Sequence, residues 1–260
     1  MVRAGVVGLC LAVLISGCAK QTREAMYPED RLALAEKLRS EGKCYKAVPH
    51  YEKLLSEFPA KHIAEQAKFN LARCHKDLKE YDQAIAGFED FIDTYPTSQL
   101  VDDAMYLIAM CYLEQAPIPE RDQSMTMKAL EELKLILREY PETDLRSEIE
   151  QAIEICRSKL AEKEYLNGRL YLRLGYPKSA IIYFDTVIND YGDTRWAGEA
   201  LLGKGIALLD QGRVDEARQV FEQVIERYPS SDLAKDAAKH LNQLGGGKRS
   251  DKWTSQDSRS

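Results

Sequence analysis

Apolar residues recur along the chain in a fixed pattern. An Ala is followed four residues later by an aromatic residue or Leu, and seven residues after that by an aromatic residue next to Pro or Gly. The five occurrences are Ala47/Tyr51/Phe58-Pro59, Ala84/Phe88/Tyr95-Pro96, Ala129/Leu133/Tyr140-Pro141, Ala180/Phe184/Tyr191-Gly192 and Ala217/Phe221/Tyr228-Pro229. Residues four apart share one face of an α-helix, and Pro or Gly ends a helix. The pattern therefore predicts five helices, each with one buried face.

A small residue marks the preceding helix in three of these five units. Ala72, Ala109 and Gly205 each lie thirteen residues after a Pro or Gly stop. Each unit is thus a helix, a turn and a second helix, and it leaves an apolar face bare unless it stacks on its neighbour. A last amphipathic helix is expected over Asp232 to Leu244, ended by Gly245-Gly246-Gly247. We predict an all-α fold, an α-α superhelix of five helix pairs with a C-terminal capping helix.

Two units are longer than the others. The intervals between the five Ala positions are 37, 45, 51 and 37 residues, which corresponds to insertions of 8 and 14 residues. The first insertion contains Ala116-Pro117-Ile118-Pro119-Glu120-Arg121 and predicts a projecting loop before a helix N-cap at Asp122. The second is close to four helical turns and predicts one long helix from about Asp144 to Leu174, stopped by Gly175.

The first eighteen residues have the layout of a secretory signal. The apolar run from Ala4 to Ile15 is shorter than the roughly 20 residues that a membrane-spanning helix needs. Ile15-Ser16-Gly17-Cys18 resembles the bacterial lipobox, which implies cleavage before Cys18 and attachment of diacylglycerol and acyl chains there. The alternative is an ordinary signal with a chance Cys at its end. We predict a signal peptide over 1–17, a lipidated tether over 18–30, the repeat domain over 31–244 and a disordered tail over 245–260.

Charge and composition narrow the classes of function. The 36 Lys and Arg and 42 Asp and Glu residues give a net charge of −6 and are interleaved, so the chain has no basic stripe for a nucleic acid. The four His residues fall in different elements, without a metal-binding or catalytic motif, so we predict no metal, no cofactor besides the lipid, and no enzymatic activity. The remaining cysteines are expected to be free thiols that act as small buried side chains: Cys44, Cys74, Cys111 and Cys156.

The repeat unit resembles the tetratricopeptide repeat. With the lipobox, Arg121-Asp122-Gln123 and Leu160-Ala161-Glu162-Lys163-Glu164, the chain is similar to the BamD family over residues 27 to 244. The resemblance implies a non-catalytic lipoprotein scaffold of the β-barrel assembly complex, on the periplasmic face of the outer membrane. Its implied partners are the periplasmic domains of BamA, the other lipoproteins of the complex, and unfolded outer-membrane proteins with their C-terminal signals. The alternative is a periplasmic adaptor lipoprotein for an envelope protease or cell-wall enzyme.

The resemblance also implies where a peptide binds. The first helix of each pair lines a concave groove, and its fifth position holds Leu32, Phe69 and Tyr106 in the first three units. The alternative for each of these three is packing between helices. Further along the same helices we predict peptide contacts from Glu36, Arg73 and Met110, with Arg39, Arg73 and Lys76 as receivers of a C-terminal carboxylate or of backbone carbonyls. Phe58 matches the family's aromatic position implicated in substrate recognition.

A second binding site is implied in the fourth unit. The family often carries an Arg three residues after the Ala of this unit, implied to pair with an acid on BamA, and this chain has Tyr183 there. Arg169, Arg173 and Lys178 are the nearby cations that substitute for it in our hypothesis.

Overall fold

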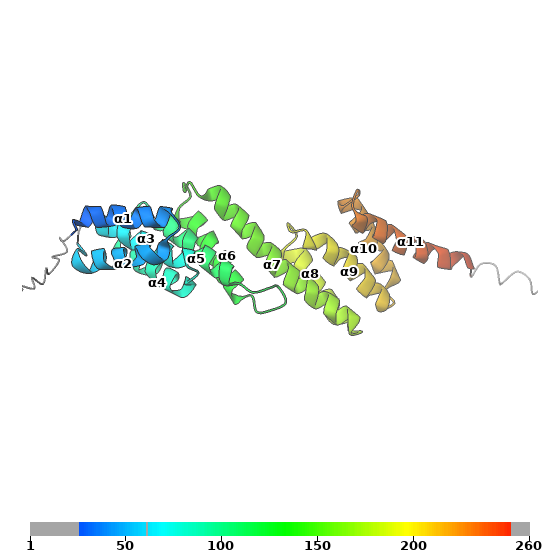
Figure 1. The fold of residues 1–260 in the computed structure, drawn as a ribbon. Coiled ribbons are helices and arrows are strands. Elements are labelled where there is room, and N and C mark those ends of the chain that lie inside the picture. The colour runs from blue at the N-terminus through cyan, green and yellow to red at the C-terminus, as the bar shows by residue number, and fades with distance from the viewer. Residues whose placement is uncertain (1–25, 61, 251–260) are drawn as a thin grey trace, which may run out of the picture.

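The computed structural model describes residues 26–60 and 62–250, and the described chain is an elongated stack of helices without a strand (Figure 1). Its helices are α1 Pro28–Ser40, α2 Cys44–Glu57, α3 Ile63–Asp77, α4 Tyr81–Thr94, α5 Val101–Gln115, α6 Ser124–Glu139, α7 Arg146–Arg173, α8 Pro177–Asp190, α9 Trp196–Asp210, α10 Val214–Arg227 and α11 Asp232–Ser250. Each helix packs on the next, and the first helices of successive pairs also touch, as in α1 with α3 and α7 with α9. The predicted superhelix of five pairs with a cap is therefore confirmed.

The repeated Ala and the large residue four positions later form the core of every pair. All ten of these side chains are fully buried: Ala47, Tyr51, Ala84, Phe88, Ala129, Leu133, Ala180, Phe184, Ala217 and Phe221. They lie on the inner face of the second helix, where they contact the first helix of their own pair and of the next. Since the core is divided into one cluster per pair, each pair depends on its neighbours for burial.

Glycine is required where an aromatic ring meets the facing helix. A Cβ at Gly168 or Gly203 would lie 2.6 or 2.7 Å from atoms of the Phe184 ring, and one at Gly205 would lie 2.5 Å from Phe221. Such distances are too short for real contacts, so a side chain at these positions would push the ring out of its place. The small residue predicted at Gly205 is thus explained by the ring that it admits.

The turn inside a pair requires a left-handed residue. Gly42, Gly175 and Gly212 have φ of 72, 79 and 73°, and Lys79 stands at the corresponding place in the second pair with φ of 63°. At each of these turns a backbone N–H after the helix donates to a carbonyl five residues earlier, for example Glu80 N–H to His75 O at 2.9 Å. Residues other than Gly rarely adopt this left-handed backbone conformation, because their Cβ atom crowds the backbone. The backbone of Lys79 is therefore strained.

Replacing Lys79 with Gly is therefore expected to stabilise the protein. Removal of the left-handed strain outweighs the extra backbone freedom of Gly in the unfolded chain, and the net gain in the free energy of unfolding is about 0.5–1 kcal/mol. Urea unfolding followed by circular dichroism measures this difference. The matched reverse change, Gly212→Lys, should lower the midpoint, and a lower midpoint for Lys79→Gly would contradict the interpretation.

The first insertion is a loop over residues 116–123, with the helix N-cap displaced by one residue from the predicted Asp122 to Gln123. Helix α6 begins at Ser124 with Gln123 as its N-cap residue, and Asp122 instead accepts a hydrogen bond from the Ser124 N–H at 2.9 Å. The buried Gln123 amide donates to Ile118 O at 2.8 Å and accepts from Thr126 Oγ1 at 2.7 Å. This buried amide holds the loop, which is why the turn extends past Asp122.

The second insertion is the long helix α7. It begins at Arg146 rather than Asp144, because Thr143 Oγ1 accepts the Leu145 N–H at 3.2 Å and holds a turn before the helix. It ends at Arg173, one residue before Leu174. Its N-terminal half packs against α6 and its C-terminal half against α8 and α9, so one helix belongs to both halves of the stack (Figure 1).

The capping helix runs further than predicted. Helix α11 continues through Gly245-Gly246-Gly247 to Ser250, so these glycines do not end it at Leu244, and the tail predicted from 245 begins inside a helix. Glycine weakens a helix without preventing one, since it keeps its N–H and adopts helical φ readily. The signal peptide over 1–17, Cys18, most of the tether and residues 251–260 lie outside the described residues.

Candidate functional site

The residues predicted to line the groove belong to α1, α3 and α5. Leu32 and Phe69 are only 8 and 5% exposed and lie in the cores of the first two pairs, where Phe69 contacts Phe88 at 5.7 Å between ring centroids. Their side chains are therefore not a surface for a peptide, and the alternative of helix packing holds for both. Tyr106 is partly exposed and packs at the edge of the third core. The apolar surface of the groove is accordingly concentrated on α5.

Four positions further along these helices lie an acid, a cation and an apolar residue: Glu36, Arg73 and Met110. Glu36 accepts a hydrogen bond from Gln66 Nε2 at 2.5 Å, which joins α1 to α3. The Arg73 guanidinium lies over the Phe69 ring at 5.8 Å and forms no ion pair among the described residues, although its charge acts to lower the pKa of the nearby Asp103 of α5. Met110 is partly exposed beside the third core. Arg73 and Met110 therefore remain available to a ligand, whereas Glu36 is already engaged.

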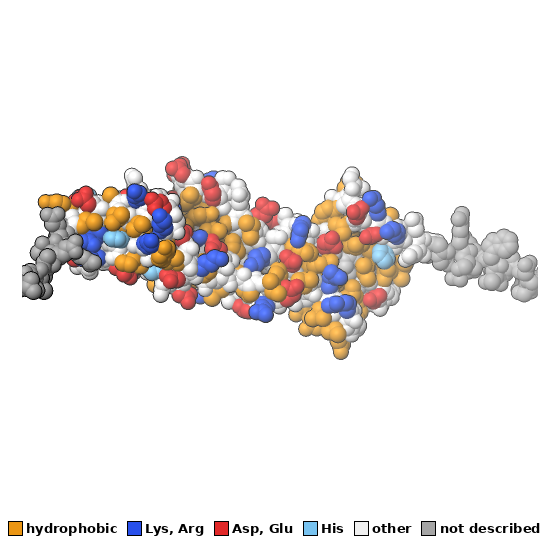
Figure 2. All heavy atoms as spheres, in the orientation of Figure 1, with side chains coloured by type: hydrophobic (Ala, Val, Ile, Leu, Met, Phe, Trp, Pro, Cys, Tyr) orange, Lys and Arg blue, Asp and Glu red, His pale blue; other side chains and the backbone are white. Residues whose placement is uncertain are grey.

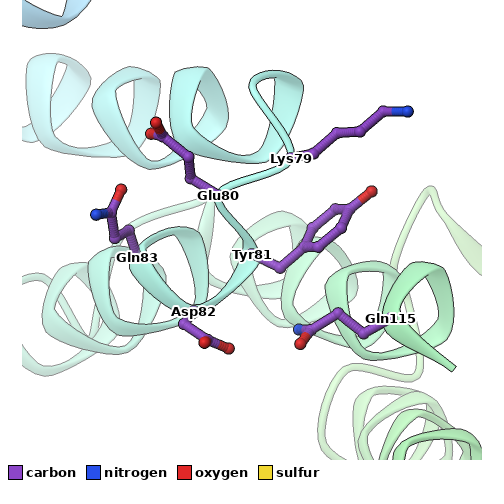
Figure 3. Close-up of a pocket in the computed structure, with 6 residues that line it drawn as sticks. All are labelled: Lys79, Glu80, Tyr81, Asp82, Gln83 and Gln115. Carbon is purple, nitrogen blue, oxygen red and sulfur yellow. The ribbon is translucent and has the colours of Figure 1, made fainter.

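Lys76 is held by the protein itself. Its ammonium forms an ion pair with Glu114 at 2.7 Å, and the Tyr81 hydroxyl donates to the same carboxylate at 3.0 Å. The prediction that Lys76 receives a peptide carboxylate is not supported, because an acid of α5 takes that place. Beside this cluster lies a polar pocket of about 320 Å³, across which Tyr81 and Gln115 approach each other while Lys79 points outwards (Figure 3). None of its lining residues was among those predicted.

Arg39 has no such counter-ion in the described part of the chain. It lies near Cys44, Tyr51 and Cys74, where the positive guanidinium opposes the effect of burial on their pKa values. Burial raises the pKa of the Tyr51 hydroxyl far above its usual value, so this group remains protonated. Neither Tyr51 Oη nor Arg39 Nε has a hydrogen-bond partner within residues 26–60 and 62–250. Sequence reasoning missed Tyr51, although it is the only hydroxyl among the five large core residues of the repeat.

Phe58 lies at the end of α2, at the far end of the first pair from Arg39. It is half-buried, and its N–H donates to Leu54 O at 2.9 Å. Phe58 and Arg39 therefore lie at opposite ends of the first helix pair, about one helix length apart, and cannot belong to one small site.

Three of the four residues predicted in the fourth unit lie near the corner where α7 ends and α8 begins: Arg173, Lys178 and Tyr183. Arg169 instead lies over the Tyr165 ring at 5.7 Å, and the Tyr165 hydroxyl donates to Glu199 of α9 at 3.4 Å. The Tyr183 ring stacks on Tyr171 of α7, with 5.2 Å between centroids and 11° between planes. Arg173 and Lys178 are exposed, and neither forms an ion pair within the described ranges. The corner therefore presents positive charge that the described part of the protein does not neutralise.

Apolar side chains share this corner with the cations. Leu170, Leu174 and Tyr176 are 43, 58 and 60% exposed, and we call these three residues the corner patch. Figure 2 shows apolar side chains gathered at this end of α7 and the start of α8. Sequence reasoning missed them, although Leu170 and Leu174 lie off the buried face formed by Tyr165 and Gly168. Exposed apolar groups gathered in one place are typical of protein-binding surfaces.

Neither a metal-binding cluster nor a membrane-spanning helix is found in the described residues. No three His, Cys, Asp or Glu side chains there gather closely enough to hold a metal ion. Within the same ranges, no helix combines the length and apolar character that crossing a membrane requires. Cys44, Cys74, Cys111 and Cys156 are free thiols and buried, in the role of small core residues that the sequence predicts.

Comparison with known proteins places the chain in a family. The profile of YfiO, an outer membrane lipoprotein family, matches residues 24–208, and a tetratricopeptide repeat profile matches residues 199–231. Outer membrane protein assembly factor BamD of Caulobacter vibrioides is 28% identical, over 92% of this chain and 81% of its own length. The BamD of Rickettsia prowazekii is 26% identical, over 86% of this chain and 90% of its own.

Solved structures of repeat proteins also match. The TPR2AB domain of yeast Sti1, in a complex described with pHSP90, is 16% identical and covers 84% of each chain with a TM-score of 0.43. The family profile, by contrast, covers well over half of this chain, from the first helix into α9. The chain therefore belongs to the YfiO family of outer membrane lipoproteins, whose curated relatives are the BamD outer membrane protein assembly factors.

Proposed function

We propose that this protein is a non-catalytic scaffold of the β-barrel assembly complex, anchored through lipid on Cys18 at the periplasmic face of the outer membrane. It binds the periplasmic domains of BamA at the corner of α7 and α8, and it receives the C-terminal segments of unfolded outer-membrane proteins in the groove of α1, α3 and α5. Other lipoproteins of the complex are further partners.

The observation that carries the BamA site is the combination of charge and apolar surface at the corner. The corner patch is exposed, and Arg173 and Lys178 beside it form no ion pair in the described chain. An apolar centre with a charged rim is the usual anatomy of a protein interface. The position where the family often has an Arg is occupied by Tyr183 in a stacked pair, so the cations of this interface come from the neighbouring positions.

Fewer residues of the groove are available for a peptide than the sequence predicts. Leu32 and Phe69 are buried and Lys76 is ion-paired, which leaves Arg39, Arg73, Tyr106 and Met110 to face a ligand. Two cations on α1 and α3 and two large side chains on α5 suit a peptide with an anionic end and apolar side chains.

A pull-down from detergent-solubilised outer membranes tests the proposal. The lipidated protein is expected to recover BamA in stoichiometric amount, whereas Cys18→Ser is expected to leave the membrane fraction and to recover at least about tenfold less, since a chain without lipid loses its local concentration. A purified Cys18→Ser protein mixed with soluble BamA periplasmic domains serves as the control, and it should still bind. Recovery of an envelope protease or cell-wall enzyme in place of BamA would contradict the proposal and favour the adaptor alternative.

A further inference from the structure

One core position differs in chemistry between the first repeat and the rest. The large residue four positions after the repeated Ala is Phe88, Leu133, Phe184 or Phe221 in four repeats and Tyr51 in the first. All five side chains are fully buried, so the first repeat alone places a hydroxyl in this position. That hydroxyl has no hydrogen-bond partner among the described residues. A buried donor without an acceptor lowers stability, and Phe would avoid the cost at the same site.

A second unmatched donor lies beside it. Arg39 comes from α1 and is half-buried, and its Nε atom is buried without a partner in the same part of the chain. Tyr51 from α2 lies near this guanidinium and near Cys74 of α3, so the two donors meet where the first three helices converge. Both lie in or next to the first core cluster, which contains Tyr51, Cys44 and Cys74.

The acids near this point do not supply the missing acceptor. The Glu36 carboxylate accepts from Gln66 Nε2 at 2.5 Å, and the Asp77 carboxylate accepts from Cys44 Sγ at 3.5 Å. Lys76, the corresponding cation of the second repeat, has its own acid in Glu114. Arg39 is therefore a partly buried cation whose hydrogen-bonding capacity is incomplete within the described chain.

We propose that Arg39 and Tyr51 form the carboxylate-binding end of the groove, which takes the C-terminal carboxylate of a bound peptide. This inference rests on the proposed peptide binding and adds the anchoring group. A planar carboxylate accepts from the guanidinium with one oxygen and from the hydroxyl with the other. The Tyr51 hydroxyl is fully buried in the free protein, so the carboxylate reaches it only when the Arg39 side chain changes rotamer, and the guanidinium then donates to the second carboxylate oxygen. The peptide then runs from α1 towards Tyr106 and Met110 on α5.

The chemistry of the probe separates a C-terminal carboxylate from one on a side chain. Fluorescence anisotropy is measured with a peptide copied from the last ten residues of an outer-membrane β-barrel protein, made once with a free carboxylate and once with a C-terminal amide. The full mature chain with Cys18→Ser is used, since it needs no detergent. We expect the free carboxylate to bind about tenfold more tightly than the amide, the size of one charge-assisted interaction.

Three variants assign that preference to the two residues. Arg39→Gln is expected to reduce the tenfold ratio to below about twofold, and Tyr51→Phe to about threefold. Lys37→Gln is the matched control, because it removes an exposed cation from the same helix two residues away, and it should leave both affinities unchanged. The urea midpoint of Tyr51→Phe should be equal to or higher than that of the wild type, because the variant lacks the unpaired buried hydroxyl. A loss of binding without a loss of stability is the expected result.

The outcomes distinguish the inference from the function on which it rests. If the wild-type protein binds neither peptide, the proposed peptide binding is wrong and the anchoring site with it. If it binds both peptides equally, peptide binding stands and the carboxylate site is overturned. A tenfold ratio that survives in both Arg39→Gln and Tyr51→Phe would also overturn the assignment to these residues.

Discussion

Replacing Leu170 and Leu174 with Glu is expected to weaken the binding of BamA periplasmic domains at least about a hundredfold. These residues lie one helical turn apart at the end of α7 and are 43 and 58% exposed, so their replacement leaves the core intact. The new carboxylates cannot be buried without a large desolvation cost. They also neutralise the exposed Arg173 between them, and thereby weaken the attraction that the proposal expects for acidic groups of the partner.

Biolayer interferometry with immobilised BamA domains measures the change. Ile155→Glu is the matched control, because it introduces the same side chain on the same helix at a residue that is 52% exposed but lies away from the corner. It should bind like the wild type, and both variants should retain their helical circular dichroism. Equal binding by the double variant and the wild type would place the BamA site elsewhere.

Replacing Phe184 with Ala is expected to lower the free energy of unfolding by about 3–5 kcal/mol. The ring is fully buried between Gly168 of α7 and Gly203 of α9, and it also contacts Tyr165 at 6.1 Å between centroids. Because glycines face the ring on both sides, no side chain from those positions fills the cavity that it leaves. The ring holds α7, α8 and α9 together, so in its absence the C-terminal pairs should unfold before the first three.

Urea unfolding gives the free energy, and amide hydrogen exchange locates the weakened region. Phe184→Leu is the matched control, because Leu133 fills the corresponding position in the third repeat, and its cost should stay below about 1.5 kcal/mol. A decrease of less than about 1 kcal/mol for Phe184→Ala would contradict this description of the core. Faster exchange spread evenly over all the helices would contradict the division into local clusters.

The core could be predicted from sequence because its rule is local. Ala180 and Phe184 are one helical turn apart, and a spacing of four with a stop after it suffices to place both inside. The same pattern could not decide between lining and packing at Leu32 and Phe69, because an apolar residue satisfies both roles and its exposure depends on how closely the next pair approaches. The structure settles this in favour of packing.

The candidate binding sites could not be predicted in the same way, because they depend on contacts between helices that residue spacing in the sequence does not determine. Lys76 and Arg39 occupy the same position in successive repeats, and only the packing of α5 on α3 gives Lys76 its acid in Glu114. The corner patch could not be predicted because Leu170 and Leu174 are ordinary apolar residues at the end of an amphipathic helix, and their exposure depends on how α8 and α9 pack against α7. Tyr51 stands out when the repeats are aligned, yet its significance comes from the lack of a partner in the described fold, which is a property of the folded structure.

The length of α7 sets how much polypeptide is needed to reach both proposed sites. Tyr106 lies near Glu148 in the first turn of this helix, while the corner patch begins at Leu170 and extends past its end. Leu174 follows Glu148 by 26 positions, a rise of about 39 Å along the helix, and an extended chain covers this distance with about 12 residues. A short C-terminal segment in the groove therefore does not compete with a domain at the corner. Only a longer, still unfolded client spans the two, and for such a client contact at one site raises the effective concentration at the other.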